Sequence, residues 1–95
     1  MSSSSLLLHQ ESDLGQPSSL RALVEYLARG LVDHPEEVVV EEVDEPDALV
    51  FELKVAEQDL GKVIGKQGRT AKALRTVLSA ASSKMRRRVI LEILE

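Results

Sequence analysis

The chain has 95 residues, of which 43% are hydrophobic and 29% are charged, so its length allows one small domain with a modest core. It has no cysteine, which excludes a disulfide framework and a thiolate metal site, and only two aromatic residues, which argues against recognition of bases by aromatic stacking. The net charge is −4, and no apolar run approaches the roughly 20 residues that a membrane span needs.

Residues 1–18 are predicted to be a disordered N-terminal tail, and residues 19–95 are predicted to form the folded domain. The tail is rich in serine, contains a glycine and a proline, and shows no apolar periodicity. A segment of this composition buries too little apolar surface to offset the entropy that folding costs. The motifs with a predicted role therefore all belong to the domain.

A helix is predicted from Ser18 or Ser19 to His34. A serine side chain can accept a hydrogen bond from a free N–H at a helix start. Pro35 ends the helix, because the residue before a proline is pushed out of the α region. Tyr26 is expected to be a partly buried packing residue. The apolar positions at helical spacing are Leu20, Leu23, Val24, Leu27 and Leu31.

Two strands joined by a tight turn are predicted next. Residues 37–43 form a short segment rich in valine, which is typical of a strand, and residues 44–47 have the composition of a turn. Apolar side chains then alternate with others over residues 49–55, which indicates a half-buried strand. A link this short implies that the two strands are antiparallel.

Two helices and a last strand complete the predicted domain. The helices span residues 57–64 and about 68–83, and the strand spans residues 89–94. The order αββααβ predicts an α+β domain in which three helices pack on one face of a three-stranded mixed sheet. The predicted core consists of Leu23, Leu27, Leu31, Phe51, Leu53, Leu74, Leu78, Leu91 and Ile93.

The turn between the last two helices, Gly65-Lys66-Gln67-Gly68, carries the functional prediction. Glycine allows a positive φ and the close approach of another backbone, and the helix start that follows offers unpaired N–H groups that suit a phosphate. Residues 1–59 hold 14 acidic and 3 basic side chains, whereas residues 60–95 hold 2 acidic and 9 basic ones. This asymmetry favours a positive face directed at a polyanion. A solvated face of uneven charge is the alternative.

The segment 61–75 resembles the signature of KH domains, in which a GxxG loop clamps the backbone of about four nucleotides. The order of elements resembles the type II arrangement. From Leu20 to Glu95 the chain resembles the small single-KH proteins of bacteria, the KhpA-like family, most closely in residues 31–36 and 61–75. Ala71 departs from the pattern, because many KH domains have a larger aliphatic residue there, and it implies a slightly smaller core beneath the loop helix.

The resemblance implies a bacterial cytoplasmic protein without a cofactor that binds single-stranded RNA in post-transcriptional regulation or RNA chaperoning. It also implies a homodimer, or a heterodimer with a second KH-containing protein. Val50 and Val63 are expected to complete the groove. Arg75 either contributes or is merely solvated, and residues 86–88 either extend the basic surface or blunt a sheet edge. The predicted RNA-binding residues are Lys62, Ile64, Gly65, Lys66, Gln67, Gly68, Arg69 and Lys72.

No catalytic site is predicted. Residues 61–66 resemble a P-loop only superficially, because three residues instead of four separate the glycines and Gln67 stands where the Mg²⁺-binding Ser or Thr belongs. Neither His9 nor His34 has a Cys or carboxylate partner at ligand or triad spacing, so no metal site is expected, and His34 is interpreted as a helix-terminus residue. The sequence therefore predicts a binding protein and not an enzyme.

Two other functions stay open. The first is a KH-fold interaction or dimerisation module, which the resemblance links to cell elongation and division and which the negative total charge favours somewhat. The second is a DNA-binding helix-turn-helix protein. Gly68, Ala71 and Ala73 argue against it, because small residues at the start of a helix leave few side chains that could read bases in a major groove.

Overall fold

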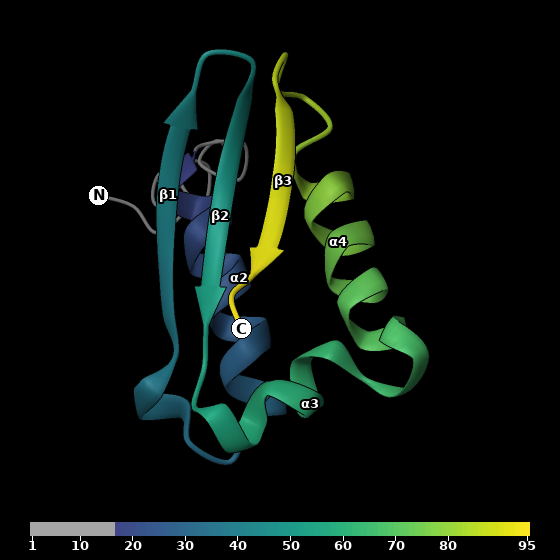
Figure 1. Cartoon of the computed structure of the whole chain (residues 1–95). Coiled ribbons are helices and arrows are strands. Elements are labelled where there is room, and N and C mark those ends of the chain that lie inside the picture. Colours follow the sequence, from purple (N-terminus) through teal and green to yellow (C-terminus); the bar gives the residue numbers. More distant parts are fainter. Residues whose placement is uncertain (1–16) are drawn as a thin grey trace, which may run out of the picture.

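The computed structural model describes residues 17–95 and shows helices packed on one side of a three-stranded sheet (Figure 1). The predicted order αββααβ and the α+β class are confirmed, and the tail predicted over residues 1–18 lies almost entirely outside the described residues. Short 3-10 turns at residues 35–37, 57–59 and 66–68 connect the elements. The helices and strands are α2 (Pro17–Leu31), β1 (Val39–Glu45), β2 (Ala48–Lys54), α3 (Leu60–Ile64), α4 (Arg69–Ala81) and β3 (Arg88–Ile93).

The start of α2 differs from the prediction. The helix begins at Pro17 and includes both serines that were expected to cap it. Proline is well suited to the first position of a helix, because its missing N–H would have no partner there and its φ already fits. The first helix of the domain therefore starts before the predicted boundary at residue 19.

The buried face of α2 is rotated from the predicted one. Leu20, Val24 and Ala28 are buried at the four-residue spacing of a single stripe. Leu31, predicted to be core, is 39% exposed, and Tyr26, predicted to be partly buried, is 77% exposed. Both predictions were wrong because an apolar sequence pattern wider than one stripe does not identify which edge of it meets the sheet.

The sheet has the order β1-β2-β3 and is mixed, as predicted. β1 and β2 are antiparallel across a two-residue turn, and β2 and β3 are parallel because α3 and α4 form the crossover between them. β1 begins two residues later than expected, since residues 35–37 form a 3-10 turn. This arrangement leaves β3 as an edge strand that runs beside α4.

The core lies between the helices and the face of β2 that carries Phe51 and Leu53, both with 0% exposure. Of the residues predicted to form the core, those from β2, α4 and β3 are confirmed as buried or packed against the buried cluster. Leu23 is only half-buried and lies outside this cluster, because the α2 stripe is rotated. The buried cluster includes Leu49, Phe51, Leu53, Leu74, Leu78 and Leu91.

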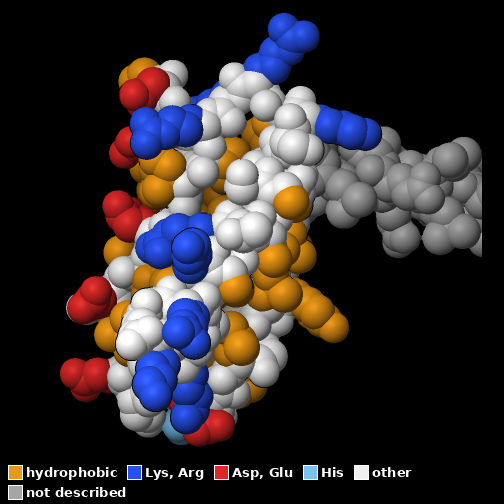
Figure 2. Space-filling view, turned by 90° about the vertical axis from the view of Figure 1, so that its right-hand side faces the viewer, with side chains coloured by type: hydrophobic (Ala, Val, Ile, Leu, Met, Phe, Trp, Pro, Cys, Tyr) orange, Lys and Arg blue, Asp and Glu red, His pale blue; other side chains and the backbone are white. Residues whose placement is uncertain are grey.

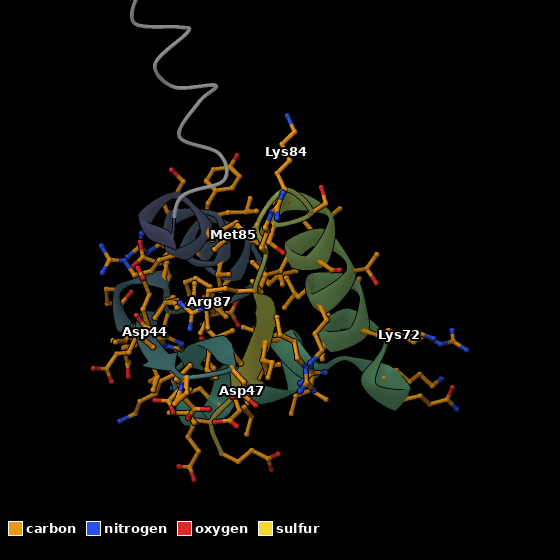
Figure 3. All side chains as sticks on the ribbon, turned by 90° about the horizontal axis from the view of Figure 1, so that it is seen from above. Asp44, Asp47, Lys72, Lys84, Met85 and Arg87 are labelled. Atoms are coloured by element: carbon orange, nitrogen blue, oxygen red, sulfur yellow. The ribbon has the colours of Figure 1, made fainter. Side chains whose placement is uncertain are left out.

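Arg87 makes hydrogen bonds to the β1–β2 turn at one end of the sheet. Its guanidinium donates to the Asp44 carboxylate at 2.7 Å and to the backbone carbonyls of Glu45 and Ala48 at 2.6 and 2.8 Å (Figure 3). Arg87 therefore ties the β1–β2 turn to the start of β3. Of the three arginines at residues 86–88, this one has a structural role.

Candidate nucleic-acid interface

The predicted turn joins α3 to α4 at one end of the domain. The N–H of Gly65 donates to the carbonyl of Gly61 at 2.8 Å and so ends α3. The N–H of Gly68 donates to the carbonyl of Gly65 at 3.1 Å and closes a 3-10 turn over Lys66–Gly68. α4 starts at the next residue, Arg69, so the turn places its exposed residues at the positive end of a 13-residue helix.

The backbone of the turn requires glycine at Gly65 for two reasons. Its φ is +79°, and a Cβ built there would lie 2.7 Å from the Cβ of Thr70. Gly68 has a φ of +73° but open space around it, so its requirement is conformational only. Gln67 also has a positive φ of 58°. Glycine adopts a positive φ without steric strain, but Gln67 does so at a cost in free energy, which fits a segment whose backbone shape serves a function.

The predicted binding side chains gather around this turn. Lys66, Gln67, Arg69 and Lys72 are exposed, and an Arg69 guanidinium nitrogen lies 3.3 Å from the Gln67 side-chain oxygen. Figure 2 shows Lys and Arg side chains clustered on this side of the molecule. Lys62 is exposed too, but its Nζ lies 3.5 Å from the carboxylate of Asp33. Because an exposed pair of this kind contributes little stability, Lys62 can exchange it for a phosphate.

The apolar part of the predicted groove is only partly present. Ile64 is half-buried and packs against the core beside the turn. Val63 is fully buried, so it supports the turn from inside and offers no surface to a ligand. Val50 is also buried, and it alternates with Phe51, so its side chain is directed to the sheet face away from the helices. The expectation that Val50 and Val63 line the groove is therefore wrong.

A buried carboxylate beneath α3 was missed by the sequence interpretation. Asp59 is 0% exposed and immediately precedes α3. One oxygen, Oδ2, accepts the backbone N–H of His34 at 2.9 Å and lies 3.0 Å from its Nδ1, while Oδ1 has no partner among the described residues. The pair joins the connection between α2 and β1 to the start of the helix that leads into the turn. His34 is thus more than a helix-terminus residue.

Each partner changes the ionisation of the other. The hydrogen bond to Asp59 raises the pKa of His34 above its ordinary value of 6.5, and burial opposes this shift. Burial acts to raise the pKa of Asp59, but hydrogen bonds from the His34 side chain and backbone outweigh it and lower the pKa below 3.8. His34 and Asp59 are therefore both charged at pH values between the lowered pKa of Asp59 and the raised pKa of His34.

We expect this pair to make stability depend on pH. A raised His34 pKa contributes stability that is fully present below pH 6.5 and is lost as the pH rises through the raised value. A lowered Asp59 pKa contributes stability above pH 3.8 that is lost as the pH falls through the lowered value. The difference in melting temperature between the native chain and His34→Gln should therefore be largest between pH 3.8 and pH 6.5. A difference that stays constant from pH 5 to pH 9 would contradict the pairing.

A second surface feature lies between α2 and α4. It is a groove of about 850 Å³ with a mostly apolar lining. Tyr26, Leu31 and Val77 line it although they are among the most exposed large apolar side chains of the described residues. Glu25 and Arg29 also line it. A guanidinium nitrogen of Arg29 lies 3.9 Å from a carboxylate oxygen of Glu25, one turn earlier on α2. This groove is separate from the charged side chains of the turn and was not predicted from the sequence.

An αββααβ domain with a mixed sheet and a Gly-x-x-Gly turn between two helices is a KH domain in the type II arrangement. The family model described as "KhpA/KhpB, KH domain" matches residues 21–93, so the chain belongs to this family. Within residues 17–95 no helix is long and apolar enough to cross a membrane, and no cluster of three potential metal ligands occurs.

Relatives at about half identity cover most of the chain. It is 55% identical over 76 residues to the RNA-binding protein KhpA of Halalkalibacterium halodurans. The match covers 80% of this chain and 100% of that protein. The proteins of the same name from Clostridium acetobutylicum and Aquifex aeolicus are 53% and 51% identical, over 79% and 82% of this chain and 100% and 99% of theirs. These relatives are therefore named for a binding activity and not for a catalysed reaction.

Solved structures support the fold. A crystal structure of Era in complex with MgGDPNP and a segment of 16S ribosomal RNA matches with a TM-score of 0.52 at 24% identity, over 79% of this chain. A structure of Aquifex aeolicus Era bound to GDP.AlF4- matches with a TM-score of 0.51 at 25% identity, over 78% of this chain. In both cases the chain spans 29% of the Era chain, so the likeness concerns one part of a longer protein.

Proposed function

We propose that this chain binds single-stranded RNA, and that the Gly65–Gly68 turn clamps the RNA backbone. The observation that carries the proposal is the turn itself. Its backbone adopts positive φ values, its two central side chains are exposed, and it leads into the start of α4. A helix start attracts a phosphate through its unpaired N–H groups and its partial positive charge.

The surrounding residues support this proposal. Lys66, Arg69 and Lys72 are exposed beside the turn, and no carboxylate within residues 17–95 forms an ion pair with them. Relatives that share about half of the sequence are named RNA-binding proteins. The proposal extends to a cytoplasmic protein of post-transcriptional regulation or RNA chaperoning, as the resemblance to the KhpA-like family implies.

The proposal predicts binding that depends on salt. If about three phosphates are neutralised, a plot of log K against log salt should have a slope near −2, taking roughly −0.7 per phosphate for a single strand. Filter binding with single-stranded RNA, single-stranded DNA and duplex DNA measures it. RNA should bind most tightly. A slope near zero would indicate an apolar or protein ligand, and a preference for duplex DNA would favour the helix-turn-helix alternative.

A second function, dimerisation, is favoured by the α2–α4 groove. We propose that a second copy of the chain covers it. The groove exposes Tyr26, Leu31 and Val77, and its lining contains both Glu25 and Arg29. A two-fold interface places the same patch on both subunits, so Glu25 of one copy can pair with Arg29 of the other. A second KH-containing protein is the alternative occupant, and the family description names KhpA and KhpB together.

Light scattering and one substitution test the dimer. The native chain should have the mass of two copies, and Val77→Glu should have the mass of one, because it places a charge in the apolar part of the groove. Glu52→Gln, a change on the open sheet face, should stay dimeric. If the native chain were monomeric at all concentrations tested, a second copy would be excluded as the occupant of the groove. A second KH-containing protein would then be the alternative occupant.

A further inference from the structure

The short helix α3 leads directly into the Gly65–Gly68 turn and cannot hold its position by itself. It has five residues, Leu60–Ile64. An isolated helix shorter than about 12–15 residues is marginal in water, because its few hydrogen bonds do not offset the cost of starting it. Contacts with the rest of the domain must therefore hold α3, and the same contacts decide where the turn lies.

The apolar contacts of α3 hold it against the core but leave its orientation less well defined. Val63 is fully buried, and Leu60 and Ile64 are half-buried and pack against the buried cluster. The hydrophobic effect has no preferred direction. A hydrogen bond, in contrast, weakens steeply when its angle or its length changes, so it can fix the orientation of a short helix.

Asp59 makes hydrogen bonds of this kind at the start of α3. An Asp at this position commonly accepts a hydrogen bond from the first N–H groups of its own helix, but Asp59 makes no such bond. Its Oδ2 instead accepts the backbone N–H of His34 at 2.9 Å and lies 3.0 Å from the His34 Nδ1. Figure 1 shows α3 and the connection between α2 and β1, which contains His34, at the same end of the domain. The carboxylate therefore joins α3 to a segment 25 residues earlier in the sequence.

Stability alone does not account for this pair. Asp59 is the one charged side chain that is buried within residues 17–95, and its Oδ1 is the one buried side-chain oxygen or nitrogen there without a hydrogen-bond partner. Burying a charge and leaving an acceptor unpaired both cost free energy, and an apolar pair of similar size is often as stable. A requirement for one defined position of α3 accounts for what stability does not.

The His34 side of the pair is also held in place. Pro35 disfavours the helical conformation for His34, whose φ and ψ are −122° and 71°. The preceding residue, Asp33, has a carboxylate oxygen 3.5 Å from the Nζ of Lys62 on α3. The connection after α2 therefore contacts α3 at its start and at one of the predicted RNA-binding residues.

We propose that His34 and Asp59 are positioning residues for RNA binding, which hold α3 so that the Gly65–Gly68 turn is already in the arrangement that accepts a phosphate. We call these two residues the α3 anchor. This inference rests on the proposed function, because the turn makes the contact and the anchor only places it. A protein whose binding-competent arrangement is populated part of the time binds its ligand more weakly in the same proportion. Loss of the anchor should therefore weaken RNA binding without removing a phosphate contact.

Substitutions of His34 test the anchor by filter binding with short oligouridine, at a temperature where every variant is folded. His34→Ala removes the side-chain hydrogen bond and should bind about fivefold more weakly, if the turn is then correctly placed about one fifth of the time. The slope of log K against log salt should equal that of the native chain, whereas a lost phosphate contact would reduce it by roughly 0.7. His34→Asn should restore most of the affinity, because its amide nitrogen is as many bonds from Cα as Nδ1 is and can donate to Asp59.

Leu20→Ala is the control for general destabilisation. Leu20 is 1% exposed near the start of α2, at the opposite end of that helix from His34. This variant should melt earlier than the native chain but keep its RNA affinity where it is folded. Amide hydrogen exchange of the free protein gives a second measurement. His34→Ala should speed exchange at Gly65 and Gly68 through local opening, whereas Leu20→Ala should speed it mainly in β2, where exchange requires global unfolding.

Asp59→Asn is the second variant if His34→Ala does not stay folded. It keeps the size of the side chain and an acceptor for the backbone N–H of His34 but loses the charge, so it should also weaken RNA binding. Native affinity in a folded His34→Ala or Asp59→Asn variant, or an equal loss of affinity in Leu20→Ala, would overturn the anchor. A reduced salt slope in His34→Ala would make His34 a direct phosphate contact and would overturn it too.

Failure of the anchor and failure of the proposed function give different results. If the turn does not bind RNA, His34→Ala still speeds exchange at Gly65 and Gly68, but Lys66→Asp with Gln67→Asp leaves the RNA affinity unchanged. If only the anchor is wrong, this double variant loses RNA binding, whereas His34→Ala keeps both the native affinity and the native exchange rates of the turn.

Discussion

Replacing Lys66 and Gln67 with Asp should abolish RNA binding while the domain stays folded. Both side chains are exposed in the turn and neither contributes to the buried cluster. The double substitution removes one positive charge and adds two negative ones. A phosphate at the turn would then meet like charges at contact distance, well inside the Debye length of about 8 Å at physiological salt. Filter binding with single-stranded RNA, together with a thermal melt, measures the two outcomes.

The fold should tolerate this change. Asp at the start of a helix is favoured by the helix dipole, and both positions face solvent. The matched control is Lys54→Asp with Gln58→Asp, which changes the same residue types and the same charge at exposed positions before α3. The control should keep most of the RNA affinity. If a folded Lys66→Asp, Gln67→Asp variant kept its affinity for RNA, the turn would only connect α3 to α4. The protein-interaction module would then be the favoured function.

Truncating Leu53 to Ala should destabilise the domain by about 2–5 kcal/mol. Leu53 is fully buried on the central strand β2, with Val40 on one side in the sheet and Ile93 on the other. Its truncation removes packing contacts and leaves a cavity between the sheet and the helices. Single domains are commonly stable by only about 5–15 kcal/mol, so the loss is a large part of the total. Denaturant unfolding measures it.

Val39 provides the control for this substitution. It lies on the neighbouring strand β1 and is 48% exposed. Val39→Ala also removes apolar side chain, two carbon atoms compared with the three that Leu53→Ala removes, but at an exposed position, so its effect should stay within about 0.5 kcal/mol. If the midpoint of unfolding changed equally for Leu53→Ala and Val39→Ala, the buried face of the sheet would be assigned to the wrong side.

The element order and the sheet could be predicted because each element has a strong local signal. Alternation in residues 49–55 identifies β2, a link of a few residues requires β1 to be antiparallel to it, and the helical crossover makes β3 parallel. The turn of the site was predictable for the same reason. Two glycines, the exposed pair between them and the helix that follows all lie within a few residues of sequence.

Features that depend on tertiary packing were missed. Asp59 and His34 are 25 residues apart, and nothing in their local sequence shows that burial brings them within 3.0 Å. The rotation of α2 depends on how α2 meets the sheet and α4, so the exposure of Tyr26 and Leu31 could not be read from periodicity. The same limit applies to Arg87, whose partners lie about 40 residues away.

The measurement that tests the clamp most directly is an NMR titration of the native chain with a short single-stranded RNA. Backbone amide signals report where a phosphate approaches, without any substitution. We expect the largest shift changes at Gly65–Gly68 and at Arg69 and Thr70, with small changes in α2 and β1. Changes confined to residues of the α2–α4 groove, with the turn unaffected, would contradict the proposed clamp.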